Sequence, residues 1–318
     1  MCYSGQIVAE HRKYEREWGV TIDIKRYVEL FWERHNGAPV KTPKAMDDAF
    51  LTPQNPDEQS IRDAILGYRE AQSAKLQQDM FAQAKRLADA ERQLRSKPTK
   101  AAAESRRVAR KKIEHAKARL GDLARVDHLD RDSRIFPGVY AHVLVMEEGR
   151  RVLKPMRYQC RPCGKPALYD RKYPGTYNAR RDNLDGFWRG QFGVSHGIVV
   201  MDAFFENVAH HAVEGRELAP GETEKSVVLE FRPQPRHNML VACLWSHWHA
   251  PGQPDLLSFA AITDEPPLEV AAAGHDRCII PIKPENIDAW LEPRQRLADM
   301  HNILDDRDRP YYEHRMAA

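Results

Sequence analysis

The chain lacks an apolar run long enough to cross a membrane, which would need roughly 18 consecutive apolar residues. Residues 1–30 carry acids, bases and aromatics, whereas a signal peptide needs an uninterrupted apolar core. Cysteine is also scarce: five cysteines are scattered over 318 residues, which argues against a disulfide framework and for reduced thiols. We therefore expect a globular protein of the cytoplasm with no membrane partner, whose 42% hydrophobic residues form a core.

The familiar signatures of hydrolases and nucleotide-binding proteins are missing, including HEXXH, the P-loop and the GxSxG elbow. Cys160 and Cys163 form a CxxC pair, but a structural zinc site needs two further ligands, and the nearby chain offers no second CxxC or HxxxH. A redox CxxC is expected where a strand meets a helix, whereas this pair lies in a proline-rich connection between strands. The sequence therefore predicts no metal site and no cofactor.

Charge is small in total and concentrated locally. The net charge is +3, yet residues 150–181 hold ten Lys/Arg and a single acid, Asp170, so this window is +9 and the rest of the chain is −6. Such an excess attracts polyanions if the fold brings the charges to one face. Four tyrosines lie among the bases, and single-stranded nucleic-acid sites combine cationic grooves with stacking platforms. The window is thus a candidate surface for single-stranded DNA.

The first third of the chain is predicted to be helical. Residues 8–35 have apolar positions at helical spacings with a break at Gly19, and a polar, proline-containing stretch follows over 36–56. Two segments on either side of Pro98 then place apolar residues at heptad-compatible steps. These positions are Leu76, Met80, Leu87 and Leu94 before the proline and Ala109, Ile113, Ala116, Leu120 and Leu123 after it. An antiparallel hairpin and a dimeric coiled coil satisfy this pattern equally well, so the hairpin could serve a protein partner or self-association.

Beyond Arg134 the pattern changes to short strands separated by Gly, Pro and charged turns. The predicted strands are 139–146, 197–206, 226–231, 238–248, 256–263 and 277–282, followed by a short helix over 284–291 and an irregular tail. This predicts an α+β protein with a mostly antiparallel β-barrel or sandwich core and a helical-hairpin insertion. The expected units are 1–56, 57–126 for the hairpin, and 127–318 for the β-rich core, which should fold without the hairpin.

The chain begins MCYSGQIV, so removal of Met1 would leave Cys2 with a free α-amine. Three further motifs follow in order: TYNARRDNL (176–184), the apolar VVMDAFFEN (199–207) with its lone Glu, and AAAGHDRCIIPI (271–282). Together with RIFPGVYAHVLV (134–145), this order resembles the SOS-response-associated peptidase family, whose members act as abasic-site processing proteins. The resemblance spans residues 1–8 and about 134–285 and leaves the helical region outside it.

The resemblance implies a DNA-damage function in which Cys2 captures the ring-opened aldehyde of an abasic site in single-stranded DNA. Its amine would form a Schiff base and its thiol would close a thiazolidine, a covalent protein–DNA linkage with peptidase- or lyase-like chemistry. His275 would be the general acid/base, Glu206 would orient or deprotonate the amine, and Asn178 would hold it by hydrogen bonds. The expected DNA contacts are Arg180, Arg181, Arg277, Arg161 and Lys165.

The chain departs from the family pattern in two places that face the DNA in the family. Members usually continue Met-Cys-Gly-Arg and carry tryptophan-bearing turns before the Asn, whereas this chain has Met-Cys-Tyr-Ser and MRYQCRPCGKP (156–166). Two other functions stay open: a thiol peptidase or autopeptidase using Cys2 and His275, and a non-enzymatic nucleic-acid-binding module with a coiled-coil partner arm. The protein is expected on the nucleoid when it is bound to DNA.

Overall fold

A computed structural model describes residues 3–293 and 296–317, so Cys2 lies outside the described residues. The longer strands are β4 (Tyr140–Glu147), β5 (Arg150–Tyr158), β7 (His196–Ala209), β8 (Ser226–Gln234), β9 (Met239–Trp248), β10 (Leu256–Asp264) and β12 (Tyr311–Met316). The shorter strands are β1 (Ser4–Ile7), β2 (Thr21–Ile22), β3 (Arg134–Ile135), β6 (Asn178–Arg180) and β11 (Cys278–Ile279). The longer helices are α1 (His11–Trp18), α2 (Ile24–His35), α4 (Pro56–Ser96), α5 (Lys100–Ala124) and α10 (Leu297–Asp305). The shorter helices are α3 (Lys44–Asp48), α6 (Tyr169–Lys172), α7 (His210–Val213), α8 (Leu268–Ala272) and α9 (Ile287–Leu291), with 3-10 turns at 130–133, 181–183 and 284–286.

The described strands form one 12-stranded, mostly antiparallel sheet that closes on itself. β10 pairs with β5, β5 with β4, β4 with β7, and β9 joins β7 back to β10, which makes a ring of five strands. β2, β5 and β6 supply the parallel pairs, β2 with β5 and both β5 and β6 with β10. The α+β class and the barrel-like core predicted from the sequence are therefore confirmed.

Alternation along the strands buries both faces of this ring. Val199 and Met201 of β7 belong to one apolar cluster, and Ile198 and Val200 belong to a second. The second cluster lies beneath α1, α9 and α10, with Trp290 of α9 fully buried. Because side chains of a strand point alternately to opposite faces, near-continuous apolar runs are what a strand buried on both sides requires.

Two histidines are buried in the neutral form at the edge of this core. His196 donates from Nδ1 to the Trp290 carbonyl (3.0 Å) and accepts at Nε2 from the backbone N–H of Gly193 (2.8 Å). His142 lies 2.8 Å from the Ala9 carbonyl through Nε2 and 2.6 Å from the Tyr27 hydroxyl through Nδ1. Burial lowers the pKa of each imidazole to about 3. The hydrogen bonds and the burial of both imidazoles therefore require the neutral form.

The N-terminal helices pack into a separate apolar cluster beside β4. Gly19 ends α1 in the left-handed conformation at φ 60°, where glycine carries no Cβ penalty, and this explains the predicted break in residues 8–35. Ile61 and Ile65 of α4 are fully buried in this cluster with residues of α2 and α3. The first turns of α4 therefore pack with the rest of the fold outside the hairpin, which we call the body. The boundary expected at residue 57, between the N-terminal unit and the hairpin, lies within this packing.

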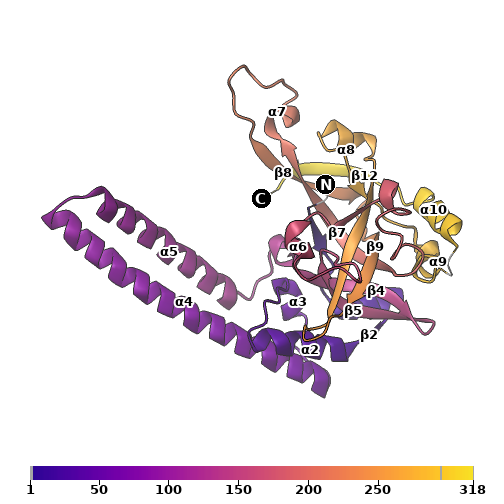
Figure 1. The fold of residues 1–318 in the computed structure, drawn as a ribbon, viewed down its shortest axis with the longest axis horizontal. Helices are drawn as coiled ribbons and strands as arrows, with labels where there is room; N and C mark the ends of the chain where they lie inside the picture. The colour runs from indigo at the N-terminus through magenta and orange to yellow at the C-terminus, as the bar shows by residue number, and fades with distance from the viewer. Residues whose placement is uncertain (1–2, 294–295, 318) are drawn as a thin grey trace.

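Beyond the body, α4 and α5 form an antiparallel hairpin that projects away from the sheet (Figure 1). Its buried seam includes Ala109 and Ala116 of α5, which the heptads predicted, and also Ala102 of α5 and Ala90 of α4, which they did not. The predicted leucines and methionine of α4 are half-buried. The seam is mostly alanine, which lets the two helices approach closely. The hairpin alternative is confirmed within one chain.

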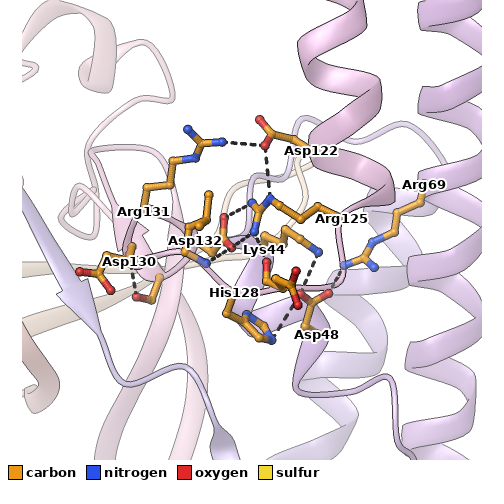
Figure 2. A network of polar contacts seen from close by, with 12 residues as sticks. Lys44, Asp48, Arg69, Asp122, Arg125, His128, Asp130, Arg131 and Asp132 are labelled. Carbon is orange, nitrogen blue, oxygen red and sulfur yellow. Dashed lines mark hydrogen bonds and ion pairs between the residues drawn. The ribbon is translucent and has the colours of Figure 1, made fainter. Parts of the chain in front are cut away.

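A polar network holds the base of the hairpin to the body (Figure 2). Asp48 of α3 accepts ion pairs from Lys44 (2.8 Å) and from Arg69 of α4, and His128 approaches it at 3.8 Å. Arg125, at the end of α5, binds both oxygens of Asp132 at 2.7 Å. Both helices are thus attached to the rest of the fold by charged contacts at the base of the hairpin.

The structure adds strands that the sequence pattern did not predict. β5 lies within the basic window, β1 precedes the first predicted helix, β6 follows the proline-rich connection, and β12 replaces part of the tail expected to be irregular. α10 also lies in that tail. Within the described residues, none of the helices is long and apolar enough to cross a membrane.

Candidate functional site

The site forms where the first strand of the chain meets the middle of the sheet. β1 pairs antiparallel with β7 in a register that sets Ser4 opposite Phe205. Continued by one position, this register places the backbone of Tyr3 beside Glu206. The Tyr3 ring makes edge contacts with Phe136 (5.7 Å between centroids) and with Tyr177 (6.0 Å), the neighbour of Asn178. The start of the described chain is thus set between Glu206 and Tyr177–Asn178.

Arg134 fixes this first strand. Its guanidinium stacks over Phe205 (3.8 Å to the ring centroid) and over Phe136 (4.9 Å). The same group donates to the Ser4 hydroxyl from Nη2 (2.9 Å) and Nε (3.1 Å), and Ser4 is buried. Burial lowers the pKa of Arg134 from its usual range. The residues Tyr3 and Ser4, which differ from the usual family pattern, are therefore bound by side chains that the sequence motifs did not identify as site residues.

Glu206 and His275 form a buried acid–imidazole pair. Nε2 of His275 lies 3.0 Å from Oε2 of Glu206, which is fully buried, and Nδ1 lies 2.8 Å from the carbonyl oxygen of Arg277. The backbone N–H of Arg277 also lies 3.3 Å from Nδ1, so Nδ1 can donate to the carbonyl of Arg277 or accept from its N–H, and Nε2 donates to the carboxylate whenever it carries a proton. Burial lowers the pKa of His275. The pair can therefore take up or release a proton at a buried position.

The turn that presents His275 depends on a glycine. Gly274 has φ +94°, a conformation that a residue with a Cβ rarely adopts, and an added Cβ would meet the Cβ of Ala212 at 3.4 Å. Gly274 lies in the connection between α8 and β11 and allows the chain to turn sharply there. The imidazole then faces β7 instead of solvent.

Asn178 begins β6, which runs parallel to β10 with Asn178 opposite Ala261. It is buried, and the Tyr158 hydroxyl lies 3.5 Å from its Oδ1. Thr263 of β10 lies opposite both Arg180 of β6 and Ile279 of β11, so the strand carrying Asn178 and the turn carrying His275 meet at the same end of β10.

The five predicted DNA contacts divide between two ends of β10. Arg180 and Arg277 both approach Asp182, Arg277 at 3.8 Å, and so lie at the end that carries the turn of His275. Arg181 is at the same end but is held by Asp264 (3.0 Å) and Asp305.

Arg161 and Lys165 lie towards the other end. The Arg161 backbone N–H donates to Ser258, five positions before Thr263, which is about 17 Å along a strand. The Arg161 guanidinium stacks on Trp248 at 4.3 Å, and the Lys165 carbonyl accepts from the same indole. The fold therefore does not bring the five basic residues into one cluster.

The basic window as a whole is largely neutralised by acids from elsewhere in the chain. Arg151 pairs with Asp288, and Lys154 pairs with Asp23 and Glu147. Arg157 and Arg161 share the one acid of the window, Asp170. The window of +9 therefore does not form a surface of +9, because three of the four bases in β5 (Arg151, Lys154 and Arg157) pair with acids.

Within the described residues, no group of three or more His, Cys, Asp or Glu side chains is arranged to hold a metal ion. Cys160 is buried, and burial raises the pKa of its thiol to about 12, whereas Cys163 is exposed. The CxxC pair therefore combines one inert thiol with one accessible thiol.

Comparison with known proteins places this site in a family. The chain belongs to the SOS response associated peptidase (SRAP) family, whose model matches residues 96–317. The match includes Asn178, Glu206 and His275 and excludes residues 1–95, which hold Cys2 and most of the helical region. No curated protein matches the chain.

Three crystal structures are similar in part. A protein from Bordetella bronchiseptica is 16% identical, covering 58% of this chain and 87% of its own, with a TM-score of 0.47. A phage-related protein from the same organism is 18% identical over 61% of this chain and 84% of its own, with a TM-score of 0.44. A protein from Bacteroides thetaiotaomicron is 13% identical over 54% of this chain and 72% of its own, with a TM-score of 0.44.

Proposed function

We infer that this protein captures abasic sites in single-stranded DNA as a covalent adduct on Cys2. The observation that supports this proposal is the register of β1 on β7, which, continued to Tyr3, leads the described chain to Glu206 of the Glu206–His275 pair. Family membership supports a role in the response to DNA damage.

The chemistry follows from one residue that carries two nucleophiles. The α-amine of Cys2, with a reference pKa of about 7.7–8, is substantially unprotonated at cellular pH and adds to the aldehyde carbon of the opened sugar. Loss of one water gives a Schiff base. The thiol then adds to the same carbon, its proton passes to the nitrogen, and a five-membered thiazolidine closes without any change in oxidation state. This second step is intramolecular, which is a large kinetic advantage.

The buried pair would move the protons that these steps require. Formation of the Schiff base needs a proton on the departing hydroxyl and removal of one from the amine, and the Nε2–Oε2 contact offers a donor and an acceptor 3.0 Å apart. Asn178 would hold the amine from the side of Tyr177. Arg180 and Arg277 would bind phosphates next to the lesion, with Arg181 supporting them from its ion pairs with Asp264 and Asp305. Arg161 and Lys165 would contact the strand farther along.

The test is incubation of the full chain with an oligonucleotide that carries one abasic site, followed by denaturing electrophoresis and intact mass measurement. The expected adduct has the mass of the protein without Met1 plus the DNA minus one water. Cys2→Ala should abolish it, whereas Cys2→Ser should give only a reversible species that borohydride traps. Normal formation of heat-stable adduct by Cys2→Ala would overturn the mechanism, and cleavage of peptides without DNA capture would favour the peptidase alternative.

A further inference from the structure

The hairpin carries a second concentration of positive charge, which the fold leaves exposed. Residues 75–119 contain fourteen Lys/Arg and five Asp/Glu, a net charge of +9 against −6 for the rest of the chain. In the window 150–181 a similar excess is reduced by ion pairs with acids, most of them from other elements of the fold. The hairpin projects from the body, so only its own acids are close enough to compensate it (Figure 1).

The exposed bases are not equivalent on the two flanks of the hairpin. On one flank, Arg110 pairs with Glu91 across the helices (2.8 Å), and Lys117 pairs with Glu114 (3.5 Å). Arg106 lies four residues before Arg110 and Arg95 four residues after Glu91, so both extend this flank. We call Arg95, Arg106, Arg110 and Lys117 the paired flank, after the two ion pairs made by Arg110 and Lys117.

The other flank is marked by a hydrogen bond from Arg86 of α4 to the Ser105 hydroxyl of α5 (2.9 Å). Lys75 lies 11 residues before Arg86, three turns of helix, and therefore on the same face of α4. Lys112 and Arg119 follow Ser105 at steps of seven, which keeps them on the same face of α5. We call Lys75, Arg86, Lys112 and Arg119 the open flank.

The cations of the open flank outnumber the acids near them. All four side chains are exposed, and over residues 70–123, all of which the structure describes, no carboxylate comes within ion-pair distance of any of them. Asp79 shares this face, and Glu104, which pairs with Arg107, is close enough to Arg86 for that cation to help lower the Glu104 pKa. Four cations against these two acids leave the flank with a net positive charge. The cations are about 16 Å apart on α4 and about 10 Å apart on α5, from a rise of 1.5 Å per residue.

We propose that the open flank binds the phosphate backbone of double-stranded DNA next to the single-stranded segment that carries the lesion, an inference that rests on the proposed function. A straight, attached hairpin matches a duplex, which stays straight over this length, better than a flexible single strand. Single-strand sites also need aromatic stacking platforms, and Phe81 is the one aromatic residue of 70–123. Scarcity of exposed apolar residues in the same segment argues against a protein partner.

The experiment measures binding of the full chain to an undamaged duplex of about 30 base pairs, enough for roughly three turns, over a range of salt concentrations. The open-flank variant is Lys75→Gln, Arg86→Gln, Lys112→Gln and Arg119→Gln. Its matched control removes the same four charges from the paired flank: Arg95→Gln, Arg106→Gln, Arg110→Gln and Lys117→Gln. Circular dichroism and thermal unfolding check that both variants keep the hairpin.

Each lost phosphate contact lowers the slope of log affinity against log salt by about 0.9, so the open-flank variant should lose up to about 3.6 in slope and at least tenfold in affinity near physiological salt. In the control variant, the slope of log affinity against log salt should fall by less than about 0.9, the value for one phosphate contact. Equal losses in the two variants, no loss in either, or competition by polyglutamate as effective as competition by duplex DNA would overturn the proposal.

A short single-stranded abasic oligonucleotide separates this inference from the proposed function. The open-flank variant should crosslink it at the wild-type rate, because such a substrate does not reach the hairpin. If the wild-type protein fails to crosslink it while the open-flank variant still loses duplex binding, the proposed function fails and the binding surface stands.

Discussion

Arg134 offers the sharpest test of how the site is positioned, because it contacts the start of the chain without belonging to the proton-transfer pair. Arg134→Gln removes two cation–π contacts, each about 0.5–2 kcal/mol, and a charged hydrogen bond to Ser4 worth about 1.5–3 kcal/mol. Even a loss near the lower end of their sum, about 2–3 kcal/mol, raises the population in which β1 is displaced by roughly 30- to 150-fold. We expect the crosslinking rate at saturating DNA to fall about tenfold or more.

Two further variants locate the effect. Arg134→Lys keeps the charge but lacks the planar fork, so it should lie between wild type and Arg134→Gln. Ser4→Ala removes only the acceptor, and Arg134→Gln should cost less in that background, as a double-mutant cycle on the rate would show. The assay is single-turnover crosslinking, with DNA affinity measured separately.

Arg134→Gln with an unchanged rate and unchanged stability would refute this explanation of how β1 is held. A loss of DNA affinity with a normal rate at saturation would show instead that Arg134 contacts the DNA. Either result leaves the proposal for Cys2 intact, because that proposal depends on the nucleophile itself.

Two predictions concern stability. In the unfolded chain a histidine has a pKa of about 6.5, whereas His142 and His196 in the folded chain have pKa values of about 3. Below pH 6.5 the unfolded state therefore binds more protons than the folded state, so the free energy of unfolding is greatest at neutral pH and falls as the pH drops. We expect a loss of about 2 kcal/mol per ring at pH 5 in urea unfolding, and a smaller pH dependence in His196→Gln. Replacing residues 78–118 with a Gly/Ser linker should leave thermal unfolding cooperative and crosslinking of short DNA intact. Replacing 57–126 should destabilise the body, because it removes Ile61 and Ile65, each worth about 2–5 kcal/mol.

The sequence predicted the parts of the fold whose signal is local. The strands that became β4, β7, β8, β9 and β10 are apolar or β-branched runs bounded by turn residues, and their predicted ends differ from the structure by a few residues. The hairpin followed from its heptads, and its short connection at Pro98 leads back to a helix of the same chain. Each of these elements is set by its own residues and their immediate neighbours.

The missed elements depend on partners far along the chain. β5 carries Arg150, Arg151, Lys154 and Arg157, so its composition indicated a solvated basic surface until acids from other elements supplied the countercharges. β1 has four residues and pairs with β3 and β7, which lie more than a hundred residues later. No periodicity within a short segment can report such a pairing.

The candidate site also has residues that the sequence predicted and residues that it did not. Glu206 and His275 were found because each ends or precedes an apolar strand in a recognisable motif, and the structure brings them to 3.0 Å. Arg134 and Ser4 stood in quoted segments of the sequence, yet their contact joins residues 130 positions apart and left no pattern in either segment. Arginine beside two aromatic residues is a signal only once the fold shows which rings it covers.

The pairing of β1 with β7 also has a consequence for the order of synthesis. β7 is synthesised almost two hundred residues after β1, and the turn of His275 later still, which at about 5–20 residues per second is a delay of roughly 10–50 s. During this time the helical region between them can fold on local contacts, which shortens the effective loop that β1 must close. β1 is therefore made well before the strand it pairs with, and the site is completed only when most of the described chain has been made.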